Sequence, residues 1–233
     1  MRYSTPFFAA FAPLLFGRPP RPFSSALRAK VLQADSLSQW REAFGAMIPD
    51  ALLSPTRQGV GSRERLFSPL ITFWTFLAQV LCPNSPCREA VRKVQAWSAR
   101  VRAATISQST SAYCQARLRL ADQTLHCIHT HLAQRMERNT LKESHWLARP
   151  VKIIDGTNLS MPDTAPNQAA YPQSSNQQPG CGFPMMKLVG LFSLASGALL
   201  HFARGTLHIH ENQLFRHLWQ YLDPRDIVLS DRA

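Results

Sequence analysis

The spacing of the apolar residues changes near residue 150, and this change limits the folds that the chain can adopt. Before it, apolar residues recur at every third or fourth position, which is the spacing of a buried helix face. The clearest example is the series Leu66, Leu70, Phe73, Trp74, Leu77 and Leu81. After it come short β-branched runs, beginning with residues 151–159, which are typical of strands. We therefore predict the α+β class, with an α-helical domain followed by an α/β domain.

The same pattern sets the domain boundaries. We expect a helical domain over residues 36–147 and an α/β domain over residues 148–233. Residues 1–35 are expected to form a disordered leader, or non-native residues added by an upstream start codon. Pro13 interrupts their apolar stretch and no obvious cleavage site follows, which is unlike a secretory signal. The apolar stretch 70–81 is too short to cross a membrane, so we expect no membrane partner.

The excess of positive charge lies entirely in the first part of the chain. There are 26 Lys and Arg residues against 14 Asp and Glu, a net charge of +12. Residues 1–150 hold 20 basic and 8 acidic residues, whereas residues 151–233 hold 6 of each. Basic charge gathered in one region predicts a polyanionic partner, and nucleic acid is the partner we expect. A basic protein without such a partner is the alternative.

Many of these basic residues fall where two helices are expected. The segment Asn84-Ser85-Pro86 is a helix-start signal, and a Ser/Thr-rich break at 105–110 separates that helix from the next, at 111–120. Two helices that are joined by a polar turn and both carry basic residues suit binding to a DNA groove or backbone. The alternative for each residue is that its aliphatic stem packs at a domain interface. The predicted DNA-binding residues are Arg88, Arg92, Lys93, Arg100, Arg102, Arg117 and Arg119.

The five cysteines do not follow the pattern of a disulfide framework or a zinc ribbon. Their number is odd and no Cys-x-x-Cys occurs. We interpret them as reduced cysteines of a cytoplasmic protein. Cys82 and Cys87 flank a Pro-Asn-Ser-Pro turn, and a zinc site there is the weaker alternative.

The order of elements in the second part predicts which strands are neighbours. We expect a strand at 151–159, a loop at 161–182, a hairpin of strands 188–194 and 198–206, a helix at 211–222 and a strand at 227–230. Strand, strand, strand, helix, strand is the order in which a ribonuclease H-like domain begins. In that arrangement the first and fourth strands lie side by side.

Asp155 and Asp231 each end a short apolar, β-branched run, so each is predicted to lie at the end of a buried strand. If the two strands are neighbours, the two carboxylates come together. Carboxylate oxygens are the ligands that Mg²⁺ and Mn²⁺ prefer, and such ions support the cutting and joining of DNA. Spacing alone is a weak signal, because an aspartate after a strand can also cap a turn or a helix.

Several ordered motifs over residues 40–233 resemble bacterial insertion-sequence transposases of the DDE superfamily, in the branch often called the IS-four family. In the second part the motifs are Asp155-Gly156-Thr157, residues 162–168, residues 180–184 and Asp231-Arg232. In the helical part they are residues 81–91 and 111–120. The resemblance implies an incomplete ribonuclease H-like domain that uses Mg²⁺ or Mn²⁺ to cleave DNA at transposon ends and transfer strands.

The resemblance also implies roles for individual residues. Asp155 matches the first catalytic and metal-binding aspartate of that family, and Asp231 matches the second. The third acid of the family is a glutamate far downstream, for which this sequence has no position. Glu211 precedes Asp231, so it does not match, and we expect it to be structural near a helix start. We therefore expect a truncated transposase that is inactive alone.

The polar loop over residues 161–182 carries amide side chains that could contact DNA. Asn167 and Gln168 are predicted to contact DNA through their amides, with a solvated loop as the equal alternative. The expected partners are transposon-end and target DNA, with a homodimer or a full-length transposase as possible protein partners. The expected location is the bacterial cytoplasm, at the nucleoid. Two alternatives to a truncated transposase remain. The chain is either a fragment that inhibits full-length transposase or a relic that does not fold.

Overall fold

The computed structural model describes residues 37–53, 66–82, 85–101, 106–178 and 180–231. The chain divides into two compact units between Leu132 and Ala133, inside helix α7 (Asp122–Arg138). We call the described residues up to Leu132 the helical unit and those from Ala133 onward the sheet unit. The predicted α+β class is confirmed, since helices precede a four-stranded sheet. The predicted leader lies outside the described residues.

The helical unit contains α3 (Leu37–Phe44), the 3-10 helix η1 (Asp50–Leu53), α4 (Pro69–Leu81), α5 (Cys87–Val101), α6 (Ser111–Leu118) and the first part of α7. Helix α4 begins where the Ser68 hydroxyl accepts a hydrogen bond from the Ile71 backbone N–H at 3.4 Å. Thr72 and Thr75 interrupt its apolar sequence yet are buried. Their hydroxyls donate to the carbonyls of Ser68 and Ile71 at 2.8 and 2.6 Å, so neither threonine hydroxyl is left without a partner.

Large apolar side chains from five helices form the core of the helical unit. Trp40 of α3, Trp74 of α4, Val94 of α5 and Tyr113 of α6 are all buried in one cluster. Ile128 of α7 is buried in the same cluster. The helices of this unit are thus held together mainly by apolar burial.

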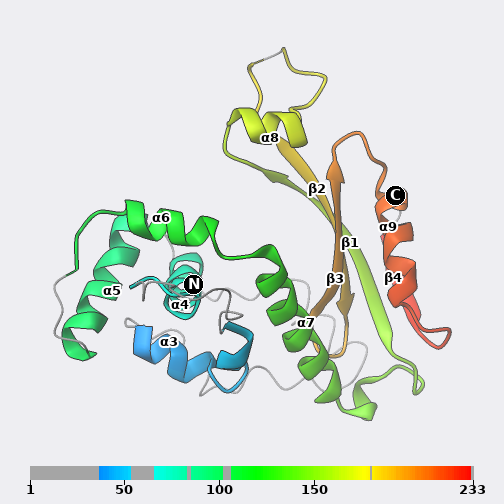
Figure 1. Ribbon diagram of the computed structural model, residues 1–233. Helices are drawn as coiled ribbons and strands as arrows, with labels where there is room; N and C mark the ends of the chain where they lie inside the picture. Colours follow the sequence, from blue (N-terminus) through cyan, green and yellow to red (C-terminus); the bar gives the residue numbers. More distant parts are fainter. Residues whose placement is uncertain (1–36, 54–65, 83–84, 102–105, 179, 232–233) are drawn as a thin grey trace, which may run out of the picture. The chain divides into compact units, whose positions relative to one another are not determined.

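The sheet unit is built on strands β1 (Val151–Ser160), β2 (Met185–Ser193), β3 (Leu199–Thr206) and β4 (Ile227–Ser230) (Figure 1). Their spatial order is β3-β2-β1-β4. The pairs β1–β2 and β2–β3 are antiparallel, and β1–β4 is parallel. The predicted pairing of the first and fourth strands is confirmed. The arrangement is compatible with part of a ribonuclease H-like domain.

Helix α9 (Glu211–Leu218) packs against the sheet and is followed by the 3-10 helix η3 (Trp219–Tyr221). Leu214 and Leu218 of α9 form one buried cluster with Ile154 of β1 and with Val189 and Leu191 of β2. This connection returns the chain to β4 alongside β1, as a parallel pair requires. The position of β4 therefore depends on the packing of α9 against the sheet.

An ion pair connects the end of α7 with the sheet. Lys152 Nζ donates to Glu137 Oε2 at 2.7 Å, although Lys152 is only 7% exposed. Glu137 Oε1 accepts from the Ser196 hydroxyl at 2.8 Å. Burial by itself would raise the pKa of Glu137, but hydrogen bonds from Lys152, Ser193 and Ser196 hold that pKa below its ordinary value.

The segment between β1 and β2 contains a short helix, α8 (Ala165–Ala170) (Figure 1). The expectation of a continuous loop over 161–182 was wrong at these positions. Thr164 precedes the helix, and its hydroxyl accepts a hydrogen bond from the Asn167 backbone N–H at 3.3 Å. Thr164 and Pro166 are residue types that suit a turn, but they equally suit the start of a helix.

No helix in the described part of the chain is long and apolar enough to cross a membrane.

Candidate functional site

Asp155 and Asp231 come together through the register of two parallel strands. The paired residues of β1 and β4 run from Val151 with Ile227 to Ile154 with Ser230. Asp155 and Asp231 are the next residues along the two strands, so both leave the parallel ladder at the same end. Both are exposed. Strand β1 continues to Ser160, so Asp155 marks the end of its buried part and not the end of the strand.

Asp155 lies on the face of β1 opposite to helix α9. Successive strand side chains point to opposite faces, and Ile154 packs against α9. Gly156 also faces α9, because a Cβ built on it would lie 2.9 Å from Cδ of Glu211. Glu211, in the first turn of α9, therefore lies across the sheet from the Asp155 side chain. This placement agrees with the structural role expected for Glu211 at a helix start.

The two carboxylates that follow the paired residues of β1 and β4 fit a divalent cation in part. Among the described residues, neither the Asp155 nor the Asp231 carboxylate has a hydrogen-bond or ion-pair partner, so their oxygens are free to bind a hard cation. The described residues hold no group of three His, Cys, Asp or Glu side chains placed to bind a metal. The pair thus supplies two carboxylate ligands and not a full set.

The predicted DNA-binding residues of α5 lie mostly on its surface. Arg88, Arg92 and Arg100 are exposed, and Arg92 forms an ion pair with Glu89 at 3.6 Å between Nη1 and Oε2. Lys93 is half-buried, and its Nζ lies 3.4 Å from the Cys82 Sγ. Arg102 lies outside the described residues. Arg88 and Arg92 are four residues apart and therefore lie on one face of α5, while contact of these residues with DNA stays a prediction.

The two predicted residues of α6 have different surroundings. Arg117 is exposed, and its guanidinium lies over the Phe76 ring at 5.0 Å from the centroid. Its Nη1 lies 3.8 Å from the Cys87 Sγ. Arg119 is exposed and follows the last residue of α6. Arg117 is therefore held against the helical unit, whereas Arg119 projects from the end of its helix.

The amides of Asn167 and Gln168 are engaged inside their own segment. Asn167 Nδ2 donates to the Pro162 carbonyl at 2.9 Å. Gln168 Nε2 donates to Asp163 Oδ1 at 2.9 Å and to the Gly182 carbonyl at 3.0 Å. These bonds favour an internal role, and contact with DNA stays a prediction for both residues.

Sequence reasoning missed the residue that organises the end of this segment, Gln173. Its Oε1 accepts from the backbone N–H groups of Gly180 and Gly182, both at 3.1 Å. Its Nε2 donates to the Gln178 carbonyl at 2.8 Å. A glutamine among many other polar residues gives no sequence signal of such a role, because the role depends on how the segment folds back.

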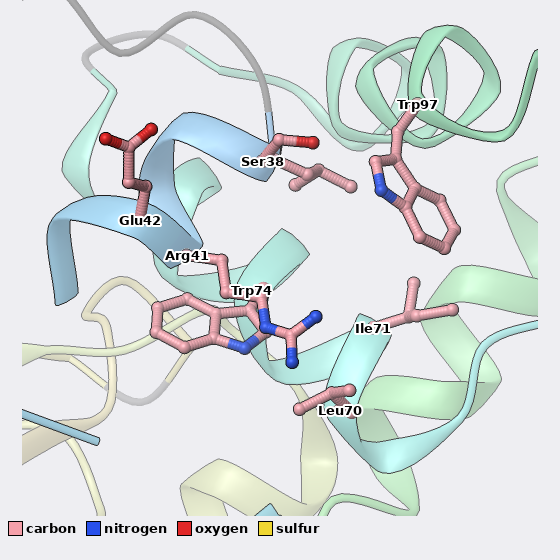
Figure 2. A pocket seen from close by; sticks show the side chains of 8 residues that line it. Ser38, Arg41, Glu42, Leu70, Ile71, Trp74 and Trp97 are labelled. Carbon is pink, nitrogen blue, oxygen red and sulfur yellow. The ribbon is translucent and has the colours of Figure 1, made fainter. Parts of the chain in front are cut away.

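The helical unit also has a hollow between α3, α4 and α5 (Figure 2). Leu70, Ile71 and Trp74 of α4 and Trp97 of α5 line it, and Arg41 reaches it from α3. The Arg41 guanidinium forms an ion pair with Asp50. The hollow is largely apolar and carries none of the predicted site residues.

A comparison with curated proteins finds similarity to the transposase InsG for insertion sequence element IS4 of Escherichia coli (strain K12). The two sequences are 26% identical over 206 residues, which cover 87% of this chain and 46% of the relative. The chain thus spans about half the length of the curated relative that it matches. No family model and no solved structure matches the chain. The resemblance to IS-four transposases, inferred above from motifs, is confirmed by this relative.

Proposed function

We propose that this chain carries two catalytic carboxylates of an insertion-sequence transposase, Asp155 and Asp231. The reaction of the complete enzyme would be metal-dependent cleavage of DNA phosphodiester bonds at transposon ends, followed by strand transfer. The observation that carries the proposal is the parallel pairing of β1 with β4, which ends one residue before each aspartate. The relative named above supports the same conclusion.

The residues of this chain would contribute position and charge to that reaction. Asp155 and Asp231 would hold Mg²⁺ or Mn²⁺, and such an ion, when bound, activates an attacking oxygen and stabilises the leaving oxygen at phosphorus. The hydrogen-bonded ladder would set the spacing of the two carboxylates, because each aspartate directly follows a paired residue of its strand. The buried cluster beneath α9 supports the same strands from one face.

Binding of Mn²⁺ tests the metal site. Electron paramagnetic resonance of Mn²⁺ should detect binding to the wild-type protein and much weaker binding to Asp155→Asn and to Asp231→Asn. Asp122→Asn is a matched control, since Asp122 is exposed in the helical unit. Equal binding by all four proteins would refute the site.

The alternative function is a DNA-binding or dimerising fragment that inhibits full-length transposase. The observation that favours it is that the net positive charge and an apolar core occur together in the helical part. Production of this chain beside a full-length transposase should then lower the frequency of transposition in cells. The effect should persist in Asp155→Asn, because inhibition would not use the carboxylates. We propose the bacterial cytoplasm, at the nucleoid, as the location for either function.

A further inference from the structure

The hollow of the helical unit is walled by apolar side chains that helix spacing gathers together. Trp74 follows Ile71 by three residues and Leu70 by four, so the three share one face of α4. Trp97 of α5 lies across the hollow from them (Figure 2). The volume of the hollow is about 360 Å³, within the range of small-molecule sites, roughly 300–1,000 Å³. The hollow therefore has the size and the walls to hold a compact apolar group.

Trp74 brings an unpaired hydrogen-bond donor to this wall. Its side chain is 3% exposed, and its Nε1 has no hydrogen-bond partner among the described residues. Figure 2 shows this nitrogen on the edge of the ring that lies toward the Arg41 guanidinium. A buried donor without an acceptor is unfavourable, so an oxygen that accepts from the indole N–H would stabilise the site.

Arg41 brings positive charge to the same part of the hollow. Its side chain is 54% exposed, and its Nη2 forms the ion pair with Asp50. A guanidinium has five N–H donors in a fork, so it can hold a second carboxylate beside the first. Glu42 also lines the hollow, but Figure 2 shows its carboxylate directed away from the Arg41 guanidinium. The charges therefore favour an anionic oxygen next to Arg41 and Trp74.

We propose that the hollow binds a small aromatic monocarboxylate. The aromatic ring of the ligand packs between Trp97 and the apolar face of α4, where offset or edge-to-face ring contacts are favourable. Its carboxylate accepts hydrogen bonds from the Arg41 guanidinium and from the Trp74 indole N–H. A movement of the exposed Arg41 side chain admits the carboxylate, because the Trp74 Nε1 is itself covered.

The indole N–H signals of the full chain test the site directly by nuclear magnetic resonance. The chain has five tryptophans, and a proton–nitrogen correlation spectrum of Trp74→Phe identifies the Trp74 signal by its loss. Titration of the wild-type protein with phenylacetate should shift this signal downfield in a saturable way, with a dissociation constant of about 1 mM or lower. The Trp40 signal should move much less, because Trp40 is not one of the described residues that line the hollow. Absence of a saturable shift at Trp74 would overturn the proposal.

Phenylacetamide tests the need for a negative charge, because it keeps the shape of phenylacetate without its carboxylate. It should bind the wild-type protein about tenfold more weakly than phenylacetate does. This comparison uses no variant, so it decides even if a substituted protein does not fold. Equal affinities for the acid and the amide would overturn the proposal.

Matched variants test the two polar contacts, with the shift of the Trp97 signal as the measure of affinity. Arg41→Gln should weaken phenylacetate binding about tenfold and Trp74→Phe about threefold, since the second change removes only the N–H donor. Trp40→Phe is the matched control for Trp74→Phe. The Trp40 Nε1 is also buried without a partner among the described residues, but Trp40 does not line the hollow. An equal loss of affinity in the two Trp→Phe variants would overturn the proposal.

Asp50→Asn tests the role of the guanidinium while keeping every lining residue of the hollow. Asp50 is partly exposed and holds Arg41 by the ion pair. Removing its charge should tighten phenylacetate binding about threefold, because the guanidinium then has no protein carboxylate that competes with the ligand. Weaker binding of phenylacetate to Asp50→Asn would show that Arg41 does not hold the ligand, and would overturn the proposal.

Discussion

At the scale of single residues, the ion pair of Lys152 and Glu137 is the contact with the largest expected effect on stability. Lys152 is almost completely buried, whereas the side chain of Glu137 is 30% exposed and also accepts from Ser196. Removing one member of a buried pair leaves the other without compensation, and the cost is greater for the more deeply buried charge. The two members should therefore differ in how much their loss destabilises the fold.

We expect Glu137→Ala to lower the free energy of unfolding by about 3 kcal/mol, because it leaves the Lys152 ammonium buried and unpaired. Lys152→Met should cost less, about 1–2 kcal/mol, because Glu137 keeps its serine donors and some solvent. The double variant should cost less than the sum of the two. Urea unfolding followed by circular dichroism measures all three. Glu143→Ala, at an exposed position, should change little, and a reversed order of the two single variants would contradict the prediction.

The same carboxylate makes the stability depend on pH. The pKa of Glu137 is lower in the folded protein than its ordinary value of 4.5, so the unfolded chain takes up the proton first as the pH falls. The stabilisation is complete above the ordinary pKa and is lost as the pH falls through the lowered folded pKa. Urea unfolding between neutral pH and about pH 3 should show a loss of stability that is smaller in Glu137→Gln. Identical profiles would exclude Glu137 as the cause.

At the scale of elements, Gly156 allows the start of α9 to approach β1. A Cβ at this position would lie 2.9 Å from Cδ of Glu211 and 3.0 Å from each of its carboxylate oxygens. The carboxylate is the end of a flexible side chain, so the clash is relieved by moving it away from the strand. The close approach explains why a glycine suits this position beside Asp155.

Gly156→Ala should therefore destabilise the wild-type protein only slightly, by about 0.5 kcal/mol, because the Glu211 carboxylate has to move aside. In a Glu211→Ala background the same change should be neutral or stabilising by about 0.5 kcal/mol, because alanine restricts the unfolded chain more than glycine does. Glu211→Gln is the matched control, since it keeps the shape of the side chain and should keep the crowding. Thermal unfolding of the six proteins measures the coupling. Equal effects of Gly156→Ala in all backgrounds would show that Glu211 is not the obstacle.

Elements with a strong local signal were predicted well. Helix α4 shows both its apolar period and its start in the sequence, and β1 shows its β-branched run. Helix α8 was missed because its six residues bury no side chain fully and give no period. Its start signal, Thr164 followed by Pro166, also suits a turn, and only the bonds of Asn167 and Gln168 within the segment distinguish the two.

At the scale of the whole molecule, the distribution of charge governs the expected interaction with DNA. The net charge of +12 belongs to residues 1–150, while residues 151–233 are neutral overall. Basic residues that neutralise phosphates release bound counterions, so the affinity for DNA falls with salt. Charge-neutralising changes in the two regions should therefore have different effects on this salt dependence.

We expect the affinity for duplex DNA of mixed sequence, measured by fluorescence anisotropy, to fall steeply with salt. The combined change of Arg88, Arg92 and Lys93 to Gln should reduce the slope of log affinity against log salt concentration by about 2–3. The matched control changes three basic residues of the sheet unit, Arg204, Arg216 and Arg225, to Gln. The control removes the same charge and should leave most of the slope in place. An equal loss of slope in both variants would place the interface elsewhere.

The sequence by itself predicted the class of fold and the pairing of the first and fourth strands, because these follow from local periodicity and from the order of the elements. It also singled out Asp155 and Asp231, whose role stays a prediction. The tertiary structure decided what depends on distant residues. Only the register of β1 with β4 places Asp155 and Asp231 directly beyond the same end of the ladder between these two strands. Only the packing of α9 places Glu211 across the sheet from Asp155. Cys87 likewise meets Arg117 only through helix packing, because residues that are far apart in sequence leave no local pattern.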